Sequence, residues 1–285
     1  MAKQTMWSIG IYVGESPFCL GAAPGLVNPI LTRDHVTGVP ARFVADPFML
    51  KVGGVWFMFF EVMNRETGRG EIGLATSECG FIWDYKQIVL TEQFHLSYPY
   101  VFEWNNEYYM IPETFEPEAV RLYKADPFPT RWSFVATLVE TRCADPSIFR
   151  YQDRWWMFTC SNPFQHDALK LYFAESLTGP WLEHPASPLL EGNKQSARPA
   201  GRVLIYDGNV IRFAQDCVTR YGNKVRAFVI SELTPNSYVE KEHELSPILA
   251  ASGDGWNELG MHQIDAHRLP DGTWIACVDG LSSVE

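Results

Sequence analysis

A hairpin pattern that recurs five times constrains the fold of this 285-residue chain more than any other feature. Each copy has a short apolar strand, a tight turn rich in Gly, Asn or Asp, and a second strand rich in aromatic side chains. The copies occupy residues 45–61, 97–113, 144–160, 197–216 and, more weakly, 261–279. Four copies share a proline near their start, and these prolines are 52, 47 and 53 residues apart. Such spacing is close to the ~40–50 residues of one propeller blade.

Each of the first three hairpins is followed by a further recurring stretch, EIGLATSECGFIWDY, AVRLYKADPFPTRWSF and LKLYFAESLTGPWLEH. A strand, a turn and a Trp before a last strand recur in each stretch, so one unit has four strands. The fifth hairpin lacks outer strands, and the N-terminal segments 7–17 and 28–32 are expected to supply them. The sequence therefore predicts an all-β, five-bladed β-propeller, a single domain over residues 1–285, closed by N-terminal strands because closure removes exposed sheet edges. A β-sandwich with coincidental repeats is the alternative.

Composition limits the classes of partner that the chain can bind. The net charge is −11 and the sequence contains no run of Lys or Arg that would form a basic patch, which argues against binding to nucleic acid. No segment approaches the ~20 apolar residues of a membrane helix, and no basic region precedes an apolar leader. The six cysteines form no CxxC pair, so we expect no zinc site and free thiols. These features favour a cytoplasmic protein without a membrane partner.

The repeat also predicts which side chains meet. The start of each first strand and the end of each second strand lie on the same face of a propeller. The strand starts are Asp46, Tyr98, Asp145, Arg198 and His262; the strand ends include Glu61, Glu113, Gln215, Asp216 and Asp279. Crowded carboxylates raise one another's pKa, which allows separate acid and base roles. The structural alternative is that an Asp before Pro only turns or caps the backbone.

Two hairpins carry a family resemblance. ADPFMLKVGGVWFMFFE and ADPSIFRYQDRWWMFTC resemble blades one and three of the arabinanases, xylosidases and arabinofuranosidases of glycoside hydrolase family 43. The resemblance implies that Asp46 is a general base and that Asp145 tunes the proton donor and orients substrate. It also implies an axial His, matched by His262, near a Ca²⁺ ion or a water cluster. The family's general acid, a Glu before Pro in blade four, is Arg198 in this chain.

A longer set of motifs carries a second, more specific resemblance. PARFVADPFM, SYPYVFEWNNEYYMIPE, RPAGRV and AQDC are similar to the propeller-like N-terminal domain of plant glucosamine inositolphosphorylceramide transferases. Similar bacterial domains accompany sugar formyltransferase-like proteins. This resemblance runs from about Trp7 to Gly280 and implies a role in glycan metabolism without indicating the sugar.

Three functions follow as hypotheses. The first is a glycoside hydrolase-like enzyme acting on a carbohydrate or glycoconjugate, with Asp46 as base, Asp145 as modulator and Glu113, or secondarily Asp216, as proton donor. We expect no cofactor, apart from the Ca²⁺ that the resemblance allows near His262. The remaining convergent residues would bind substrate: Glu61, Tyr98, Arg198, Gln215, Asp216, His262 and Asp279.

The second hypothesis is a non-catalytic carbohydrate-binding propeller that is accessory to glycan synthesis, which the loss of the blade-four Glu favours. The third is an anion-dependent glycosyl transfer or phosphorolysis in which the Arg198 guanidinium makes a bidentate contact with a phosphate or another anion. A simpler role for Arg198 is to neutralise the acids around it.

Overall fold

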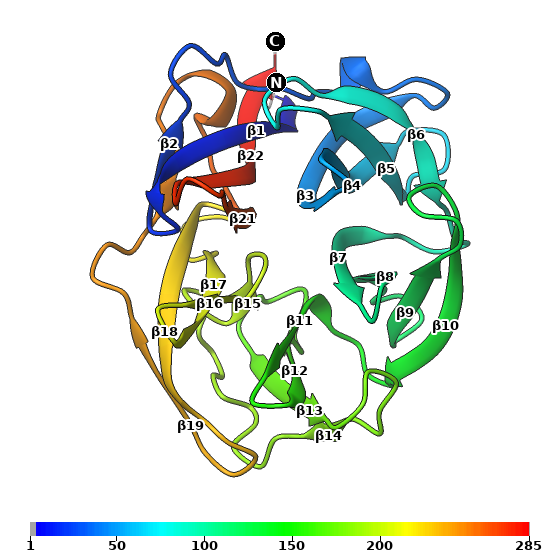
Figure 1. Ribbon diagram of the computed structural model, residues 1–285. Coiled ribbons are helices and arrows are strands. Elements are labelled where there is room, and N and C mark those ends of the chain that lie inside the picture. The colour runs from blue at the N-terminus through cyan, green and yellow to red at the C-terminus, as the bar shows by residue number, and fades with distance from the viewer. Residues whose placement is uncertain (1–3, 285) are drawn as a thin grey trace.

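The computed structural model describes residues 4–284, which form five antiparallel sheets around a central axis (Figure 1). In blades one to three the first strand in the chain lies nearest the axis and the later strands lie progressively outward. This arrangement confirms the five-bladed β-propeller that the repeated hairpins predict. We number the blades one to five from the first predicted hairpin.

Blades one to three have four strands each, in chain order from the axis outward. Blade one comprises β3 (Ala41–Val52), β4 (Val55–Asn64), β5 (Gly70–Ser77) and β6 (Asp84–Leu90). Blade two comprises β7 (Ser97–Trp104), β8 (Glu107–Glu113), β9 (Val120–Ala125) and β10 (Trp132–Val139). Blade three comprises β11 (Ala144–Tyr151), β12 (Arg154–Cys160), β13 (Leu169–Ala174) and β14 (Leu182–Glu183).

Blade four departs from this plan because its inner strand is broken. Its strands are β15 (Arg198–Pro199), β16 (Leu204–Tyr206), β17 (Asn209–Asp216), β18 (Lys224–Leu233), β19 (Tyr238–Glu242) and β20 (Leu249–Ala250). At the break, Gly201 forms a parallel bridge with Ile264 of blade five and has φ +141°. A Cβ on Gly201 would lie 1.7 Å from the Ile264 carbonyl oxygen, so only glycine permits this approach.

Blade five is closed by the N-terminal strands, as predicted. Its order from the axis is β21 (Ile264–Arg268), β22 (Trp274–Val284), β1 (Gln4–Ser16) and β2 (Cys19–Ala22). The pairing of β1 with β22 brings the two ends of the described chain together (Figure 1).

The expectation that residues 28–32 form the outermost strand of blade five was wrong. This segment makes one isolated bridge, from Leu31 to Ile9, and β2 is the outer strand instead. Pro29 has no N–H to donate to a ladder. The Asn28 side chain substitutes for backbone pairing, because it accepts from Ile11 N–H at 2.9 Å and donates to the Ile11 carbonyl at 3.0 Å.

The hairpin turns have the geometry that their residues predict. Both central residues have positive φ in four turns: Gly53 and Gly54, Asn105 and Asn106, Gln152 and Asp153, and Asp207 and Gly208. Two consecutive residues at positive φ define the type I′ turn, whose twist matches that of the flanking strands. These turns lie at the end of the axis opposite to the strand starts.

A bulge at the start of the inner strand recurs in blades one to three. The pairing register skips two residues after Ala45, Ser97 and Ala144. The first residue of each bulge, Asp46, Tyr98 or Asp145, precedes proline and has φ of 53°, 47° or 50°. Few non-glycine residues adopt this left-handed conformation, which costs on the order of 1–3 kcal/mol and typically occurs at functional or over-determined positions. The bulges re-aim these residues relative to a regular strand.

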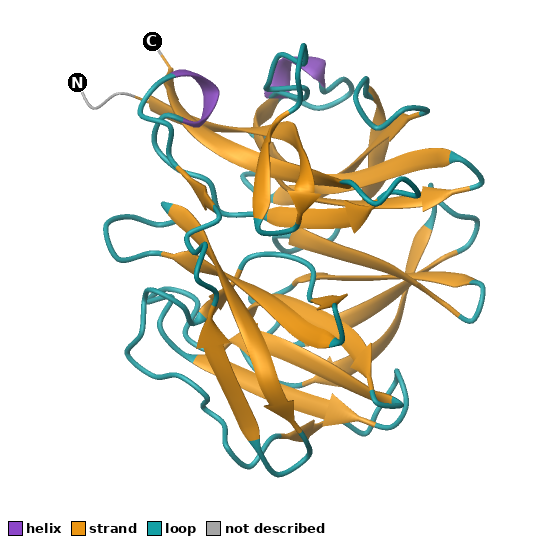
Figure 2. Cartoon of the chain, turned by 60° about the vertical axis from the view of Figure 1, so that its left-hand side comes forward, coloured by secondary structure: helices purple, strands orange, loops and turns teal. Residues whose placement is uncertain are grey.

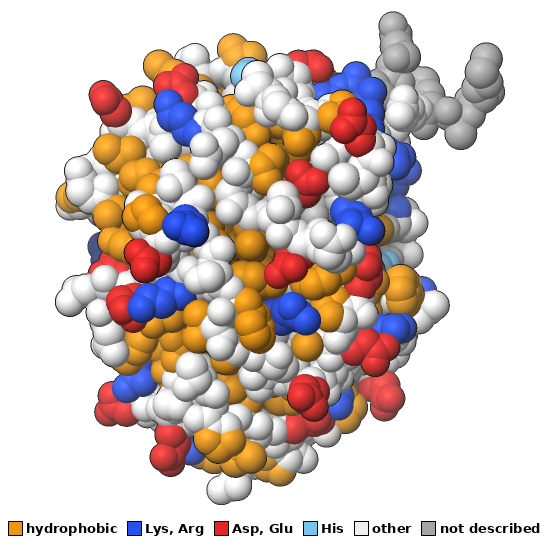
Figure 3. Space-filling view, turned by 90° about the vertical axis from the view of Figure 1, so that its right-hand side faces the viewer, with side chains coloured by type: hydrophobic (Ala, Val, Ile, Leu, Met, Phe, Trp, Pro, Cys, Tyr) orange, Lys and Arg blue, Asp and Glu red, His pale blue; other side chains and the backbone are white. Residues whose placement is uncertain are grey.

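The described chain contains little helix. Its helical segments are the short 3-10 turns η1 (Arg33–His35) and η2 (Gly255–Asn257), visible in Figure 2. Within residues 4–284, no helix has the length and apolarity needed to cross a bilayer. Basic and acidic side chains are interspersed on the face that carries β6 and β10 (Figure 3). All six cysteines lie in the described part and none forms a disulfide, although Cys19 and Cys79 are exposed.

Candidate functional site

A cavity of about 190 Å³ opens at the axis, at the end where the inner strands begin. Five of the predicted site residues line it: Asp46, Glu61, Glu113, Arg198 and His262. They come from four blades, and each is at least nine-tenths buried. The propeller therefore brings acidic side chains that are distant in sequence into one opening, as the repeat predicts.

The other predicted residues do not line this cavity. Asp145 and Gln215 lie behind Arg198, and Asp279 lies behind His262. Tyr98 is fully buried and donates to, or accepts from, Ser147 at 2.7 Å and donates to the Gly201 carbonyl at 3.2 Å. Asp216 pairs with Arg226 at 2.8 Å, away from the axial acids. The contacts of these four residues described here are with other groups of the protein, and their role in substrate binding stays a prediction.

The bulges explain part of the acidic cluster. Each bulge residue turns its backbone N–H toward a carboxylate of the preceding blade. Asp46 donates to Asp279 Oδ2 at 3.1 Å, Tyr98 to Asp46 Oδ2 at 3.2 Å, and Asp145 to Glu113 Oε2 at 3.1 Å. Buried N–H groups need such acceptors. The acids thus join neighbouring blades as well as line the cavity, and the structural interpretation of Asp-Pro holds in part.

Arg198 uses all its donors within the protein. Its Nε donates to Asp145 Oδ2 at 2.6 Å, and its Nη2 donates to Asp145 Oδ1 at 3.3 Å and Glu113 Oε2 at 3.4 Å. Its Nη1 donates to the Pro163 carbonyl at 3.0 Å and lies 2.9 Å from His166 Nδ1. A guanidinium has five N–H groups, and five partners are present. Arg198 therefore neutralises Asp145 and Glu113, and it has no pair of unused N–H groups with which to bind an anion.

Arg198 and burial act in opposite directions on Asp145. Burial raises the pKa of Asp145, and the attraction of the Arg198 guanidinium opposes that rise. Gln215 supports the same carboxylate, because its Nε2 donates to Asp145 Oδ2 at 2.8 Å and to the Pro199 carbonyl at 2.9 Å. Asp145 is thus the counter-ion of Arg198, and Arg198 and Gln215 fix it beneath the cavity.

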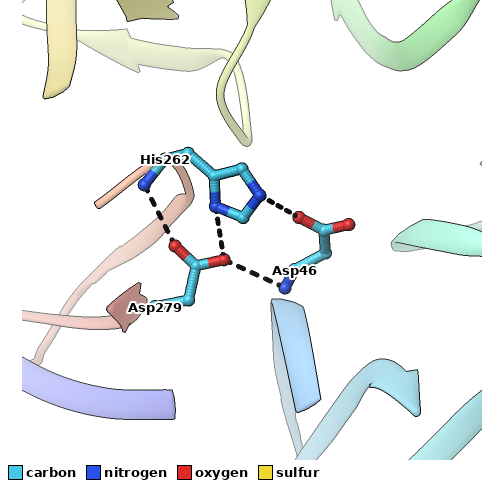
Figure 4. A group of neighbouring side chains, drawn as sticks. All are labelled: Asp46, His262 and Asp279. Carbon is cyan, nitrogen blue, oxygen red and sulfur yellow. Dashed lines mark hydrogen bonds and ion pairs between the residues drawn. The ribbon is translucent and has the colours of Figure 1, made fainter. Parts of the chain in front are cut away.

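His262 lies between two carboxylates (Figure 4). Its Nδ1 is 2.7 Å from Asp279 Oδ2, and its Nε2 is 3.4 Å from Asp46 Oδ1. Burial opposes a charge on His262, but the attraction of Asp279 and Asp46 outweighs it and raises the pKa of the imidazole. The His262 ring therefore bridges blades five and one.

The same three residues do not fit a Ca²⁺ ion, although one ligand atom from each lies within 4.8 Å of the others. Calcium takes 6–8 oxygen ligands. Asp279 already accepts the N–H groups of Asp46, His262 and Gln263. Both ring nitrogens of His262 face carboxylates rather than a shared centre (Figure 4). The expected calcium position is taken by an imidazole bridge.

Glu61 is the acid in the cavity with the weakest charge compensation. Its contact at 3.4 Å is with His95 Nε2, and burial lowers the pKa of His95, which keeps that ring neutral. Burial, followed by repulsion from Asp46 and Glu113, raises the pKa of Glu61 well above its usual range. Burial also raises the pKa of Asp46 to about 7. Burial and repulsion from nearby carboxylates thus raise the pKa values of both acids in the blade-one hairpin.

One wall of the cavity is aromatic, and the repeat analysis missed it. Trp7 of β1 stacks on the His262 ring at 3.9 Å between centroids, and the Arg198 guanidinium lies 5.0 Å from the centre of the Tyr221 ring. Phe43 also lines the cavity. Trp7 and Tyr221 lie outside the five hairpins, so no repeat position marks them. The one signal that indicates Trp7 is the alternation of large apolar residues with Ser8 and Gly10 along residues 7–11 of the sequence.

The raised pKa values predict how stability depends on pH. Asp46 has a folded pKa of about 7, against ~3.9 for an unfolded Asp, so the folded state keeps a proton that the unfolded state releases. Its contribution is complete below pH ~4 and is lost as pH rises to about 7. We expect the free energy of unfolding to fall by a few kcal/mol across this range in urea titrations.

Asp46→Asn provides the comparison, because it removes the titrating carboxyl. Its unfolding free energy is expected to fall less steeply between pH 4 and 7 than that of the wild type. Asp84→Asn, at an exposed position of β6, is expected to leave the slope unchanged. Equal slopes for Asp46→Asn and the wild type would contradict the raised pKa.

Comparisons with known proteins give both a family and a fold. A family model described as "Glucosamine inositolphosphorylceramide transferase 1, N-terminal" matches residues 2–281. The protein of that name from Oryza sativa subsp. japonica is 37% identical over 295 residues, covering 96% of this chain and 40% of the relative. The protein from Arabidopsis thaliana is 33% identical, covering 96% and 39%. The chain spans about two fifths of the length of these curated relatives.

Solved structures that share the fold include an exo-β-1,3-galactanase and a family 117 glycoside hydrolase. An exo-β-1,3-galactanase from Clostridium thermocellum has a TM-score of 0.61 at 13% identity, covering 73% of this chain and 51% of that one. A family 117 glycoside hydrolase from Zobellia galactanivorans has a TM-score of 0.53 at 14% identity, covering 84% of each chain. At these identities the likeness shows the fold alone.

Proposed function

This chain belongs to the family of glucosamine inositolphosphorylceramide transferase N-terminal domains, and on that premise we propose that its axial cavity binds a sugar residue without cleaving it. The chain would then be a carbohydrate-binding propeller accessory to glycan synthesis. The names of its relatives place it beside a transferase, and the fold is shared with enzymes that act on galactan. Both support a glycan or glycoconjugate as the ligand.

The observation that carries this proposal is the set of contacts around Arg198. The hydrolase resemblance calls for a proton donor at this position, and Arg198 has no proton to give at neutral pH. Its guanidinium also pairs with Asp145 and Glu113, two of the three residues proposed as the main catalytic acids and base. Glu113 Oε2 already accepts N–H groups from Asp145 and Arg198. Glu113 is therefore a poor replacement for the missing acid.

The walls of the cavity indicate the chemistry of the ligand. One wall is aromatic (Trp7, Phe43 and Tyr221), which suits the apolar face of a pyranose or furanose ring. Carboxyl groups also line the cavity, while the donors of Arg198 and His262 face the protein. The oxygens of these carboxyl groups can accept hydrogen bonds from hydroxyl or amine groups of a ligand. A volume of about 190 Å³ is below the ~300–1,000 Å³ of drug-sized sites and suits one sugar residue.

This reasoning makes the third hypothesis unattractive. An anionic ligand would meet buried carboxylates, and Arg198 has no unused N–H group for it. We therefore expect uronic acids, sugar phosphates and inorganic phosphate to bind more weakly than neutral or amino sugars.

Hydrolysis remains the second candidate because the two acids of the blade-one hairpin have raised pKa values. Burial raises the pKa of Asp46 to about 7 and that of Glu61 well above its usual range. Both lie at the same end of the blade-one hairpin, where Ala45 pairs with Glu61. Glu61 as acid and Asp46 as base would form a pair of the kind that glycosidases use.

Sugar binding and turnover measured together test the proposal. The probes are methyl glycosides of galactose, arabinose, glucosamine and glucuronic acid, with galactotriose and arabinotriose as substrates for cleavage. We expect a neutral or amino sugar to bind by calorimetry. Asp46→Ala is expected to weaken it at least 10-fold, since a hydrogen bond to a charged group contributes about 1.5–3 kcal/mol. Trp7→Ala is also expected to weaken it, because an aromatic face that packs on the sugar ring is lost. Exposed Asp84→Asn is the control and should bind normally.

Asp46→Asn separates the two candidates, because Asn keeps an acceptor oxygen but is not a base. Binding without release of any monosaccharide by the wild type supports the proposed binding role. Release that disappears in Asp46→Asn while binding persists would establish the hydrolase instead. Binding by none of the sugars, or preferential binding of glucuronic acid, would overturn the proposal.

A further inference from the structure

Among the acids that line the axial cavity, Glu61 has the carboxyl group least committed to the protein. Asp46 Oδ2 accepts the Tyr98 N–H at 3.2 Å, and Glu113 Oε2 accepts the Asp145 N–H at 3.1 Å. In the described part of the chain, neither Glu61 oxygen accepts a hydrogen bond, and neither is a fully buried polar atom that lacks a partner. Both oxygens are therefore accessible from the cavity that Glu61 lines, although its side chain is 8% exposed.

His95 adds a hydrogen-bond donor to this part of the cavity. It lies in the segment between β6 and β7, and its side chain lines the cavity beside Glu61. The Gly70 N–H donates to His95 Nδ1 at 2.9 Å, and burial lowers the pKa of His95, so the ring is neutral at pH 7. A neutral imidazole with an accepting Nδ1 carries its proton on Nε2. This Nε2 is 3.4 Å from Glu61 Oε1, which is longer than a normal N–H···O hydrogen bond.

Backbone contacts at Gly70 hold His95 beside Glu61. The Leu96 N–H donates to the Gly70 carbonyl at 3.0 Å, in addition to the bond from the Gly70 N–H to the His95 ring. A Cβ on Gly70 would lie 2.2 Å from the Leu96 carbonyl oxygen and 2.9 Å from both Glu61 Oε1 and His95 Cε1. A side chain at this position would therefore force the two strands of contact apart. With glycine there, the donor and the acceptor are fixed relative to each other before a ligand binds.

A single hydroxyl group can bind to both side chains at once, because a hydroxyl is a donor as well as an acceptor. Two atoms 3.4 Å apart leave positions beside them that are within hydrogen-bond distance of both. The hydroxyl O–H can donate to Glu61, which keeps acceptor capacity in either protonation state, while its oxygen accepts from His95 Nε2. An ammonium group can donate to Glu61 but has no lone pair for the His95 N–H. The pair therefore favours a hydroxyl over an amine.

We propose that Glu61 and His95 together recognise one hydroxyl group of the sugar in the axial cavity, and that this hydroxyl determines which sugars the site accepts. The hydroxyl donates to Glu61 and accepts from His95 Nε2. A sugar that lacks this hydroxyl, or carries an amine in its place, binds more weakly. The inference rests on the proposed sugar-binding function and adds to it the two residues that select the ligand.

Thermodynamic cycles between ligand and protein test this assignment by calorimetry on the full chain. The probes are methyl galactoside and methyl arabinoside, together with every monodeoxy derivative of each. We expect one derivative to bind the wild type about 10-fold more weakly than its parent, because a donor and an acceptor in the cavity then lose their partner. His95→Asn and Glu61→Ala are each expected to weaken the parent about 10-fold. In these variants the same derivative should lose little further affinity, since the group that its hydroxyl would contact is already absent.

The variants are chosen to leave the fold intact. His95→Asn keeps an acceptor oxygen for the Gly70 N–H but lacks the ring Nε2, and the Glu61 carboxyl accepts no hydrogen bond from the described residues. His95→Gln places an amide nitrogen where Nε2 was, so it should recover part of the affinity for the parent glycoside. Exposed Glu244→Gln is the matched control and should give the same affinities as the wild type for parent and derivatives.

The possible results separate this assignment from the proposed function. If the wild type binds a glycoside and each deoxy derivative loses as much affinity in His95→Asn and Glu61→Ala as in the wild type, the assignment is wrong while sugar binding stands. Equal affinity for a parent and all its derivatives would overturn it too, as would tight binding of the derivative with an amine at the coupled position. Binding of neither glycoside would remove the assignment together with the proposed function.

Discussion

Replacing Arg198 with methionine is expected to lower the free energy of unfolding by about 3–5 kcal/mol, the usual cost of removing one partner from a buried ion pair. The side chain is 8% exposed and holds Asp145, Glu113, the Pro163 carbonyl and His166 together. Methionine retains much of the volume but none of the donors. Two carboxylates from neighbouring blades would then be buried side by side without a cation. Urea titration at pH 7 measures the change.

A matched control and a rescue define what this result means. Arg150→Met removes a partly exposed guanidinium whose ion pair is with exposed Asp153, and it should cost at most about 1 kcal/mol. Adding Asp145→Asn and Glu113→Gln to Arg198→Met should restore a large part of the lost stability, because no buried charge then lacks a partner. An Arg198→Met protein of wild-type stability that loses phosphate affinity would instead establish an anion site.

The fold could be predicted from sequence because turns and alternation are local signals. Type I′ turns need consecutive residues that tolerate positive φ, and GG, NN, QD and DG occupy those positions. The outer strands were harder to place. Residues 28–32 have the composition of a strand, but Pro29 lacks an N–H, and the Asn28 side chain supplies the pairing to Ile11. The composition of the segment does not indicate that a side chain will take the place of backbone pairing.

The candidate site could be predicted by location but not by role. The position of a residue at a strand end predicts the blade and the face of the propeller on which it lies. This holds for the five residues that line the cavity: Asp46, Glu61, Glu113, Arg198 and His262. Whether a carboxylate faces the cavity or lies behind it depends on bulges and side-chain partners. Asp279 and Asp145 illustrate this point, since each is occupied by backbone N–H groups or by Arg198.

Replacing Asp279 with alanine is expected to open the junction between blades five and one. Its two oxygens accept three buried backbone N–H groups, those of Asp46, His262 and Gln263, and face the His262 ring. Each buried N–H left without an acceptor costs about 1–3 kcal/mol, so the total is on the order of 5 kcal/mol. The bulge at Asp46 would also lose the contact that holds it. Affinity of the axial cavity for sugar should therefore fall together with stability.

Hydrogen exchange distinguishes this local effect from general destabilisation. Below the unfolding transition, the N–H groups of β1, β22 and β3 should exchange faster in Asp279→Ala, while those of β12 and β13 in blade three keep their protection. Asp271→Ala, in the exposed turn between β21 and β22, is the control because its carboxylate supports Thr273 alone. It should leave exchange at the junction unchanged. Uniform loss of protection in all five blades would show that Asp279 has no special part in closing the ring, and the view that blade-to-blade carboxylates build the cavity would fail with it.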